Sequence, residues 1–178
     1  MIHDSTHLFV PTSGQSLIVG ASTPSTNIVD LAGVGSGVAP NAIFGNASVF
    51  GADMGVGDGP MNMKAWMVVG TAFVTANSAT LNAALQGAID NGSNAPGAWQ
   101  TYGETGALTA AQLVANTPFD LSLARAFPQG TLPRFLRLLW QLPAGTSFTA
   151  GTIAWASLIS TRDSYIARYY PSGFTVAG

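Results

Sequence analysis

The stretch Pro133-Arg-Phe-Leu-Arg-Leu-Leu-Trp-Gln-Leu-Pro143 carries the clearest structural signal in this chain. Its residues alternate between two faces, with Leu136, Leu138, Trp140 and Leu142 on one face and Phe135, Arg137, Leu139 and Gln141 on the other. A period of two is typical of a β-strand. A proline at each end fits strand termini and would break a helix. We therefore predict a strand here, with one face in the core.

Shorter stretches with the same period lie on both sides of this one. They are separated by Gly, Pro, Asn and Ser, which are typical turn residues. We predict strands within 15–20, 26–31, 63–69, 78–88, 99–102, 119–123 and 151–160. In the last of them, Ile153, Trp155 and Ile159 are expected on one side. Eight or so short strands at this spacing predict an all-β protein, a jelly-roll-like antiparallel β-sandwich.

Two segments depart from simple alternation. Residues 90–97 contain Asn-Gly and Pro-Gly pairs, which predict a turn. Thr109 and Gln112 stand at the spacing of a capping box, so the sequence predicts one helical turn within 108–116.

The irregular segments set the expected domain organisation. Residues 32–60 contain the glycine-rich runs 33–37 and 51–59, and a compact domain seldom needs so long an irregular stretch. We interpret 32–60 as a long Gly-rich surface excursion, and the aromatic tail 161–178 as an extended C-terminal arm. One sandwich domain is expected over 1–160, with the first residues as an N-terminal arm.

Composition restricts the function. Six basic and eight acidic residues make up 8% of the chain, against about 25% in typical soluble domains. So few charges cannot solvate a whole monomer surface, which predicts that sister subunits or a larger assembly cover much of it. The scattered basic residues form no footprint for a phosphate backbone, so we expect no direct nucleic-acid binding. No apolar run reaches 18 residues, so we expect no membrane span.

The N-terminus and the cysteine count bear on the compartment. The first seven residues lack the basic start and apolar stretch of a secretory signal, and the chain contains no cysteine. Both features are compatible with cytosolic synthesis, and the second excludes a disulfide framework.

Candidate chemistry is sparse. The acids are isolated in sequence and most stand in turn-like segments, where they cap or solvate loops. His3 and His7 are four residues apart, a zinc spacing on a helix, but no helix signal follows them. The run 33–37 lacks the Lys-Ser/Thr pair of a phosphate loop, and 51–59 offers calcium two acids without a bidentate glutamate. We expect no catalytic residue, no cofactor and no metal.

A set of segments, in this order, resembles a known family. They are the Met-Ile-x-Asp start, 25–31, the strand pair 66–86 with 71–76 and 78–86, and 132–138 followed by 148–153. Together they resemble the Bbp16-like capsid cement, or decoration, proteins of tailed bacteriophages, over most of residues 1–160. The glycine-rich excursion and the aromatic tail depart from that pattern.

The resemblance implies a structural virion protein and no enzyme. Its members are jelly-roll-like domains that sit as oligomers on the outer surface of an icosahedral head. There they bind across junctions between major capsid protein subunits and stabilise the shell. The expected partners are therefore the major capsid protein and further copies of this chain, as a homodimer or homotrimer. The expected location is the outer surface of the virion, after synthesis in the host cytoplasm.

Inter-subunit contacts are expected from 1–10, 32–60 and 161–178. The candidate contact residues are Ile2, His3, Leu8, Phe44, Phe50, Met54, Tyr165, Tyr169, Tyr170 and Phe174. Arg134 and Arg137 are expected to pair with acids of neighbouring subunits, because such pairs position partners. Trp66, Trp140 and Trp155 are expected in the core or in inter-subunit packing.

Two alternatives stay open. The first is a β-sandwich carbohydrate- or receptor-binding module of a phage fibre, with Trp99 or Tyr102 against a sugar. The second is a small glycosidase, which requires two acids to converge at about 5 to 9 Å in a cleft.

Overall fold

The computed structural model describes residues 8–18, 21–30, 63–93, 95–122 and 133–160. The described residues form strands and turns and contain no helix. The strands are β1 (Leu8–Val10), β2 (Gln15–Ser16), β3 (Thr23–Pro24), β4 (Val29–Asp30), β5 (Met63–Val69), β6 (Val74–Thr75), β7 (Thr80–Asp90), β8 (Pro96–Glu104), β9 (Leu108–Thr109), β10 (Pro118–Ser122), β11 (Phe135–Gln141), β12 (Phe148–Ala150) and β13 (Thr152–Ser160).

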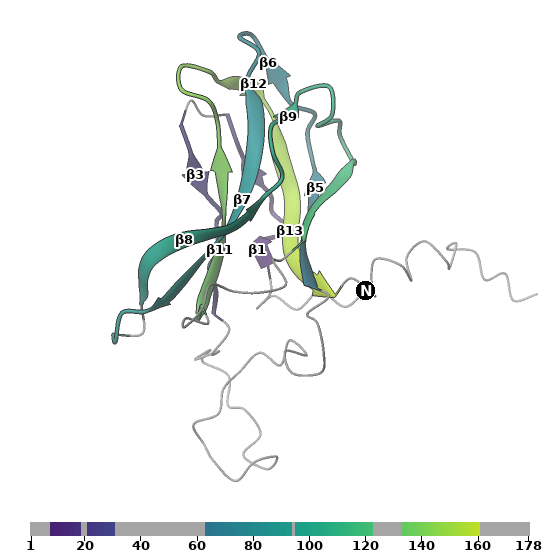
Figure 1. Cartoon of the computed structure of the whole chain (residues 1–178). Helices are drawn as coiled ribbons and strands as arrows, with labels where there is room; N and C mark the ends of the chain where they lie inside the picture. The colour runs from purple at the N-terminus through teal and green to yellow at the C-terminus, as the bar shows by residue number, and fades with distance from the viewer. Residues whose placement is uncertain (1–7, 19–20, 31–62, 94, 123–132, 161–178) are drawn as a thin grey trace, which may run out of the picture.

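The strands form two main antiparallel sheets that face each other (Figure 1). The first sheet has the order β1-β13-β5-β10, with β2 also paired to β13. The second has the order β3-β11-β7-β8, with β4 also paired to β11 and β9 to β7. Strands β6 and β12 form a small separate ladder. The all-β sandwich predicted from the alternation is confirmed.

The pairing is nested in the way that defines a jelly roll. The first strand, β1, pairs with the last strand, β13. Strands β3 and β4 pair with β11, β5 pairs with β10, and β7 pairs with β8. This is the pattern of one long hairpin rolled onto itself, so that successive strand pairs alternate between the two sheets. The turn between β7 and β8 is the tip of that hairpin.

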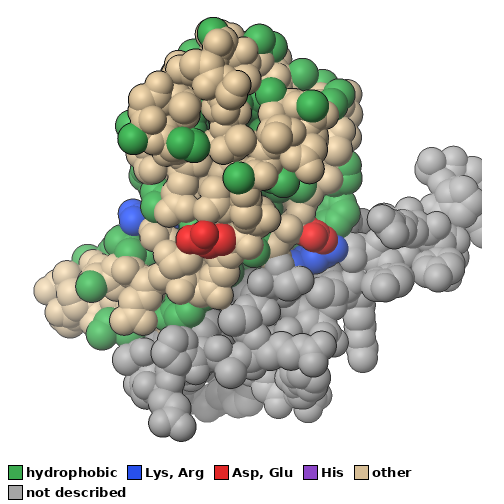
Figure 2. All heavy atoms as spheres, turned by 45° about the horizontal axis from the view of Figure 1, so that its top comes forward, with side chains coloured by type: hydrophobic (Ala, Val, Ile, Leu, Met, Phe, Trp, Pro, Cys, Tyr) green, Lys and Arg blue, Asp and Glu red, His purple; other side chains and the backbone are tan. Residues whose placement is uncertain are grey.

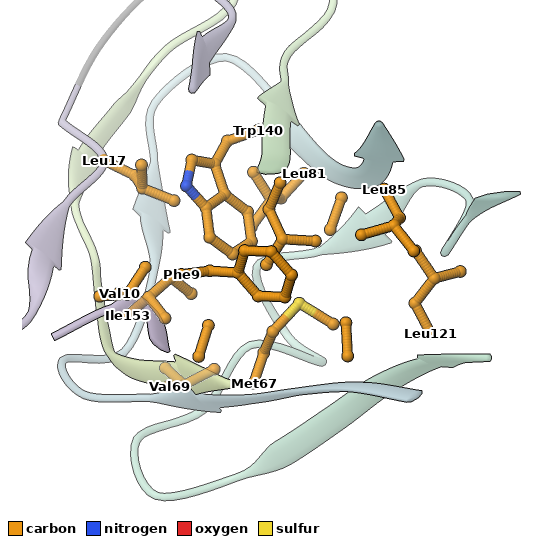
Figure 3. Packing of buried hydrophobic residues seen from close by; sticks show 14 of the residues in the cluster. Phe9, Val10, Leu17, Met67, Val69, Leu81, Leu85, Leu121, Trp140 and Ile153 are labelled. Carbon is orange, nitrogen blue, oxygen red and sulfur yellow. The ribbon is translucent and has the colours of Figure 1, made fainter. Parts of the chain in front are cut away.

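The core lies between the sheets and is built from the predicted faces (Figure 3). Leu136, Leu138 and Trp140 of β11 are at most 1% exposed, as the alternation predicts. Phe9 of β1 and Met67 of β5 meet them from the opposite sheet. The Trp140 ring is held in place by a hydrogen bond from its Nε1 to Gln15 Oε1, at 3.0 Å.

The predicted face of the last strand is wrong. A β-bulge between Ile153 and Trp155 shifts the register of β13 against β5. An extra residue reverses the alternation beyond it, so Ile153 shares the core with Ala156 and Leu158. Trp155, expected beside Ile153, is only half-buried.

The N-terminal prediction is corrected at its end. Residues 8–10 are not an arm, because β1 pairs with β13 and both Phe9 and Val10 are fully buried. The rest of that arm, the excursion 32–60 and the tail 161–178 lie outside the described residues.

The predicted helical turn within 108–116 is present as a single turn that follows a short strand. Leu108–Thr109 pairs with β7, and a single turn follows, closed by Leu113 N–H donating to Thr109 O at 3.2 Å. Gln112 Oε1 does accept from Thr109 N–H at 2.9 Å, which is the reciprocal bond of a capping box. The turn does not continue because Leu113 enters the core at 1% exposure.

The predicted turn at 90–97 is shorter than expected. Asn91 N–H donates to Ala95 O at 2.9 Å, and Gly92 supplies the positive φ of 89°. Pro96 already belongs to β8, opposite Asp90.

Candidate interaction surface

The charged side chains of the described residues are all engaged within the chain. Seven such side chains exist: Asp30, Lys64, Asp90, Glu104, Asp120, Arg134 and Arg137. Lys64 Nζ lies 2.5 Å from Asp120 Oδ2 and 4.3 Å from the centre of the Trp66 ring. Asn82 Nδ2 donates to Glu104 Oε2 at 2.9 Å. Each of these charged side chains therefore has a partner within the chain.

Arg134 joins three strands of the second sheet. Its guanidinium donates from Nε and Nη2 to the two Asp30 oxygens, each at 3.0 Å, and also bonds Asp90. Hydrogen bonding to Asp30 raises the pKa of the Arg134 guanidinium. The expectation that Arg134 pairs across subunits is therefore wrong, because the fold brings Asp30 and Asp90 to the same end of β11.

Arg137 belongs to a polar ladder on the outer face of the second sheet. Its Nε donates to Gln86 Oε1 at 2.9 Å, and Gln86 Nε2 donates to Thr101 Oγ1 at 3.2 Å. The guanidinium lies 4.1 Å from the centre of the Trp99 ring. Burial lowers the pKa of Arg137. Like Arg134, Arg137 is engaged inside its own chain.

The two candidate sugar-binding aromatics do not come together. Trp99 pairs with Ala88 and shares the outer face with Thr101 and Arg137. The Tyr102 ring lies over Gly87, where an added Cβ would meet it at 2.2 Å, on the side of the sheet that faces the core. Burial raises the pKa of the Tyr102 hydroxyl above its ordinary value. A bulge next to Thr101 accounts for this arrangement, and a small hollow of about 140 Å³ beside Tyr102 belongs to the hairpin tip.

Of the other three tryptophans, one lies in the core and two are half-buried on the outer face of the first sheet. Trp140 is fully buried. Trp66 is half-buried on the outer face of the first sheet, opposite Ser157 on one side and Asp120 on the other. Trp155 is half-buried next to Val68 on that face. The outer face of the first sheet therefore carries two half-buried tryptophans.

At one end of the sandwich, the connections among the described residues carry no charged side chain. Three connections meet there, 70–79, 105–117 and 142–151, and none contains Asp, Glu, Lys or Arg. We call this surface the neutral end. Figure 2 shows it without blue or red, while the charged side chains lie at a level further down the sandwich.

Hydrogen bonds tie the three connections of the neutral end together. Phe73 N–H donates to Leu113 O at 3.0 Å, which joins the first to the second. Asn77 Nδ2 donates to Gly145 O and Asn77 Oδ1 accepts from Ser147 N–H, each at 3.1 Å, which joins the first to the third.

Apolar packing fixes the neutral end from below. The rings of Phe73 and Phe148 pack edge to face, with 4.8 Å between their centroids. The Phe73 ring packs directly against Gly151, whose φ is 148°. A Cβ at this position would lie 2.4 Å from the ring, so only glycine leaves room for it.

The neutral end also presents apolar groups to solvent. Val74 is 52% exposed and Val114 is 51% exposed. Each of these valines directly follows one partner of the backbone bond between Phe73 and Leu113. The surface thus combines a rigid frame, small polar side chains and two exposed valines. It can bind a partner by shape, apolar contact and hydrogen bonds, without electrostatic steering.

Most of the predicted contact residues cannot be located in the described structure. Leu8 is half-buried in β1, opposite Ser157. The other nine lie outside the described residues, namely Ile2, His3, Phe44, Phe50, Met54, Tyr165, Tyr169, Tyr170 and Phe174. His7 and the runs 33–37 and 51–59 lie outside them as well.

The neutral end was missed by reasoning from the sequence. Its only sequence signal is the absence of charge from three separate stretches. Nothing in the sequence says that these stretches meet, because only the jelly-roll pairing brings them to one end.

Over the described ranges, no group of three or more His, Asp or Glu side chains could hold a metal ion. No helix long and apolar enough to cross a membrane is found in the same ranges. No family model matches the chain, and neither does any curated protein.

Proposed function

We propose that this protein is a capsid cement, or decoration, protein that binds the outer surface of an icosahedral phage head. Its partners would be the major capsid protein and further copies of itself. In this role it stabilises contacts between capsid subunits and performs no catalysis. It needs neither nucleic acid nor a membrane. The proposal unites the ordered sequence resemblance, the jelly-roll sandwich and the deficit of charge.

The neutral end is the observation that carries the proposal. All seven charged side chains of the described residues are engaged within the chain, so none is left to recognise a charged ligand. A rigid uncharged surface with two exposed valines suits a permanent neighbour better than a soluble substrate. We assign the neutral end as the surface that meets the capsid.

The mechanism requires only binding. A protein that binds the assembled lattice, and not its separate subunits, stabilises the lattice by mass action. Copies that bridge neighbouring capsid subunits gain avidity in addition. A neutral interface also avoids the desolvation of charges, which often cancels the gain from ion pairs.

The experiment is co-sedimentation of the purified protein with phage heads. The protein should sediment with heads in a saturable manner and stay in the supernatant without them. Heads decorated with it should resist heat or chelator-induced disruption better than bare heads. Failure to bind heads of the cognate phage would contradict the proposal.

A second candidate has one observation in its favour. The Trp99 ring lies beside Arg137 and the Gln86–Thr101 pair, an aromatic surface with polar groups close by, which is a common arrangement for binding sugars. This favours a carbohydrate- or receptor-binding module of a phage fibre. Arg137 already stacks on that ring and Tyr102 faces the other way, so the site is less complete than the neutral end. Glycan binding that is lost in Trp99→Ala, with no binding to heads, would favour this candidate.

A further inference from the structure

We propose that the outer edge of β8 is a self-association site, at which two copies of this chain pair their β8 strands antiparallel about a two-fold axis at Gln100. In so far as it makes the protein an oligomer, this inference rests on the proposed function. Its test needs no capsid, so the two can fail separately.

The edge strands of the two sheets differ in how well they are protected. β1 has three residues and is followed by Pro11, and β3 has two residues and ends in Pro24. β10 begins with Pro118 and carries the ion-paired Asp120. Charges, prolines and short length are the usual means of blocking pairing at a sheet edge.

β8 has such protection only toward its ends, where it begins with Pro96 and has a bulge on each side of residues 99–101. It runs for nine residues, and Glu104 at its end is its only charged residue. No other strand of the described residues pairs with its outer edge. The β7–β8 hairpin projects from the body of the sandwich, so no other described strand covers that edge (Figure 1). Ala98, Gln100 and Thr101 are exposed.

The backbone shows which groups of β8 face outward. In an antiparallel strand the N–H and C=O of one residue point to the same side. The backbone groups of the odd-numbered residues along β7 point toward β8. Thr105 N–H donates to Ala83 O at 3.0 Å, and Asn91 N–H, directly after β7, donates to Ala95 O at 2.9 Å. Gly87 is opposite Gln100, so the Gln100 backbone is used toward β7.

Trp99 and Thr101 therefore present their backbone N–H and C=O groups to the open edge. A two-fold axis at Gln100 places Trp99 opposite Thr101 of the second copy, and Thr101 opposite its Trp99. Each such pair exchanges two hydrogen bonds, so the symmetric arrangement satisfies all four groups of each strand. Pro96 and the bulges on both sides of residues 99–101 limit the pairing to these residues.

The side chains agree with a second copy as the occupant. The paired residues 99–101 and their neighbours from Gly97 to Gly103 carry no charge, so self-pairing sets no like charges against each other. With the axis at Gln100, Glu104 of one copy is opposite Pro96 of the other copy. The two Glu104 side chains are therefore not opposite each other. The two Gln100 side chains meet on the axis, where amides can hydrogen-bond to each other.

Cysteine crosslinking tests this geometry directly, because the chain has no cysteine of its own. In Gln100→Cys the two thiols face each other in a non-hydrogen-bonded pair, the closest kind of cross-strand pair. Oxidation should convert most of this variant to a disulfide dimer. In the control Ala98→Cys the two thiols are offset by four residues, about 13 Å, and should not crosslink. Crosslinking of neither variant, or of both equally, would overturn the inference.

A charge swap gives an independent test by light scattering. Gln100→Lys and Gln100→Glu should each shift the protein from dimer to monomer, and an equimolar mixture should restore the dimer. The Gln100 side chain is exposed and its backbone is unchanged, so both variants should keep the wild-type melting temperature. If both single variants keep the molecular mass of the wild-type oligomer, the two-fold axis at Gln100 is contradicted, whatever the number of subunits.

A variant of the neutral end separates this inference from the proposed function. Val74→Asp should keep the dimer mass and the Gln100→Cys crosslink while it weakens binding to heads. If Val74→Asp abolishes head binding but Gln100→Cys stays monomeric, the proposed function stands and the β8 inference fails.

Discussion

The two ends of the sandwich are held together by different forces. At the neutral end, an aromatic pair and neutral hydrogen bonds fix three connections, and no charge is present. At the opposite end, the strands are joined by Arg134 with Asp30 and Asp90 and by Lys64 with Asp120. The charges serve to join strands within the chain, which leaves the neutral end available for contacts that depend on shape.

The strongest test of this comparison is removal of the aromatic support. Phe148→Ala removes a ring that is 2% exposed and packs on Phe73. We expect a loss of about 3–5 kcal/mol in the free energy of unfolding, since a large buried side chain leaves a cavity. Chemical denaturation at low and high salt should give the same loss, because no charge is involved. A loss below about 1 kcal/mol would show that the rings do not support this end.

Gly151→Ala tests the same support from the backbone. The added Cβ would meet the Phe73 ring at 2.4 Å, and the φ of 148° disfavours any residue with a Cβ. We expect a lower melting temperature, by an amount smaller than in Phe148→Ala if the ring can shift. Gly106→Ala is the matched control, since its φ of 76° is also positive but nothing lies near its Cβ. An equal effect of the two substitutions would assign the strain to the backbone alone.

At the charged end, Arg134→Met removes the side chain that joins three strands. Asp30 and Asp90 then lose their common partner, so the melting temperature should fall, and it should fall further at low salt, where the two carboxylates repel more strongly. Arg134→Lys keeps the charge but not the paired bonds to Asp30, and should show an intermediate effect. Salt-independent losses in both variants would contradict the electrostatic account of this end.

The Lys64–Asp120 pair should contribute less. Lys64 is only 10% exposed, but Asp120 is 43% exposed, so solvent screens the carboxylate and we expect a contribution of about 1 kcal/mol. Lys64→Met keeps most of the packing on Trp66, so urea unfolding should differ from the wild type by no more than that amount. A larger loss would mean that the pair is part of a more extensive network.

The smallest expected effect is a pH dependence at Tyr102. Burial raises the pKa of its hydroxyl above the ordinary value of 10.0, so the unfolded chain releases this proton first as the pH rises. The resulting stabilisation is full below about pH 10 and is lost as the pH rises through the raised pKa. Between pH 8 and 11 the wild type should therefore lose slightly more melting temperature than Tyr102→Phe. Identical pH profiles would contradict the shift.

The sequence predicted the strands better than their faces. Alternation located β5, β7, β11 and β13, because each has a half-apolar pattern that burial of one face requires. It failed on Trp155, since a single-residue bulge leaves no trace in the pattern but reverses every side chain beyond it. It located the capping box of Thr109 and Gln112 but not the short strand at Leu108–Thr109, because two residues carry no alternation.

The candidate site was less accessible to such reasoning. The pairing of Arg134 with Asp30 joins residues 104 positions apart, and the neutral end unites three connections that are separated in the sequence by whole strands. Such contacts depend on which strands pair, and local patterns do not encode the pairing. What the sequence did provide was the deficit of charge, which pointed to a surface made for partners.

Binding of Val74→Asp to phage heads tests the central claim most directly. Val74 at the neutral end is 52% exposed, and Ile28, which precedes β4 near the charged end, is 47% exposed. Both are apolar and similarly accessible, so Ile28→Asp is a matched control for an added surface carboxylate. The account predicts that Val74→Asp weakens sedimentation with heads at least tenfold while Ile28→Asp binds like the wild type, about 1.4 kcal/mol apart. Equal binding by the two variants, or a loss confined to Ile28→Asp, would contradict it.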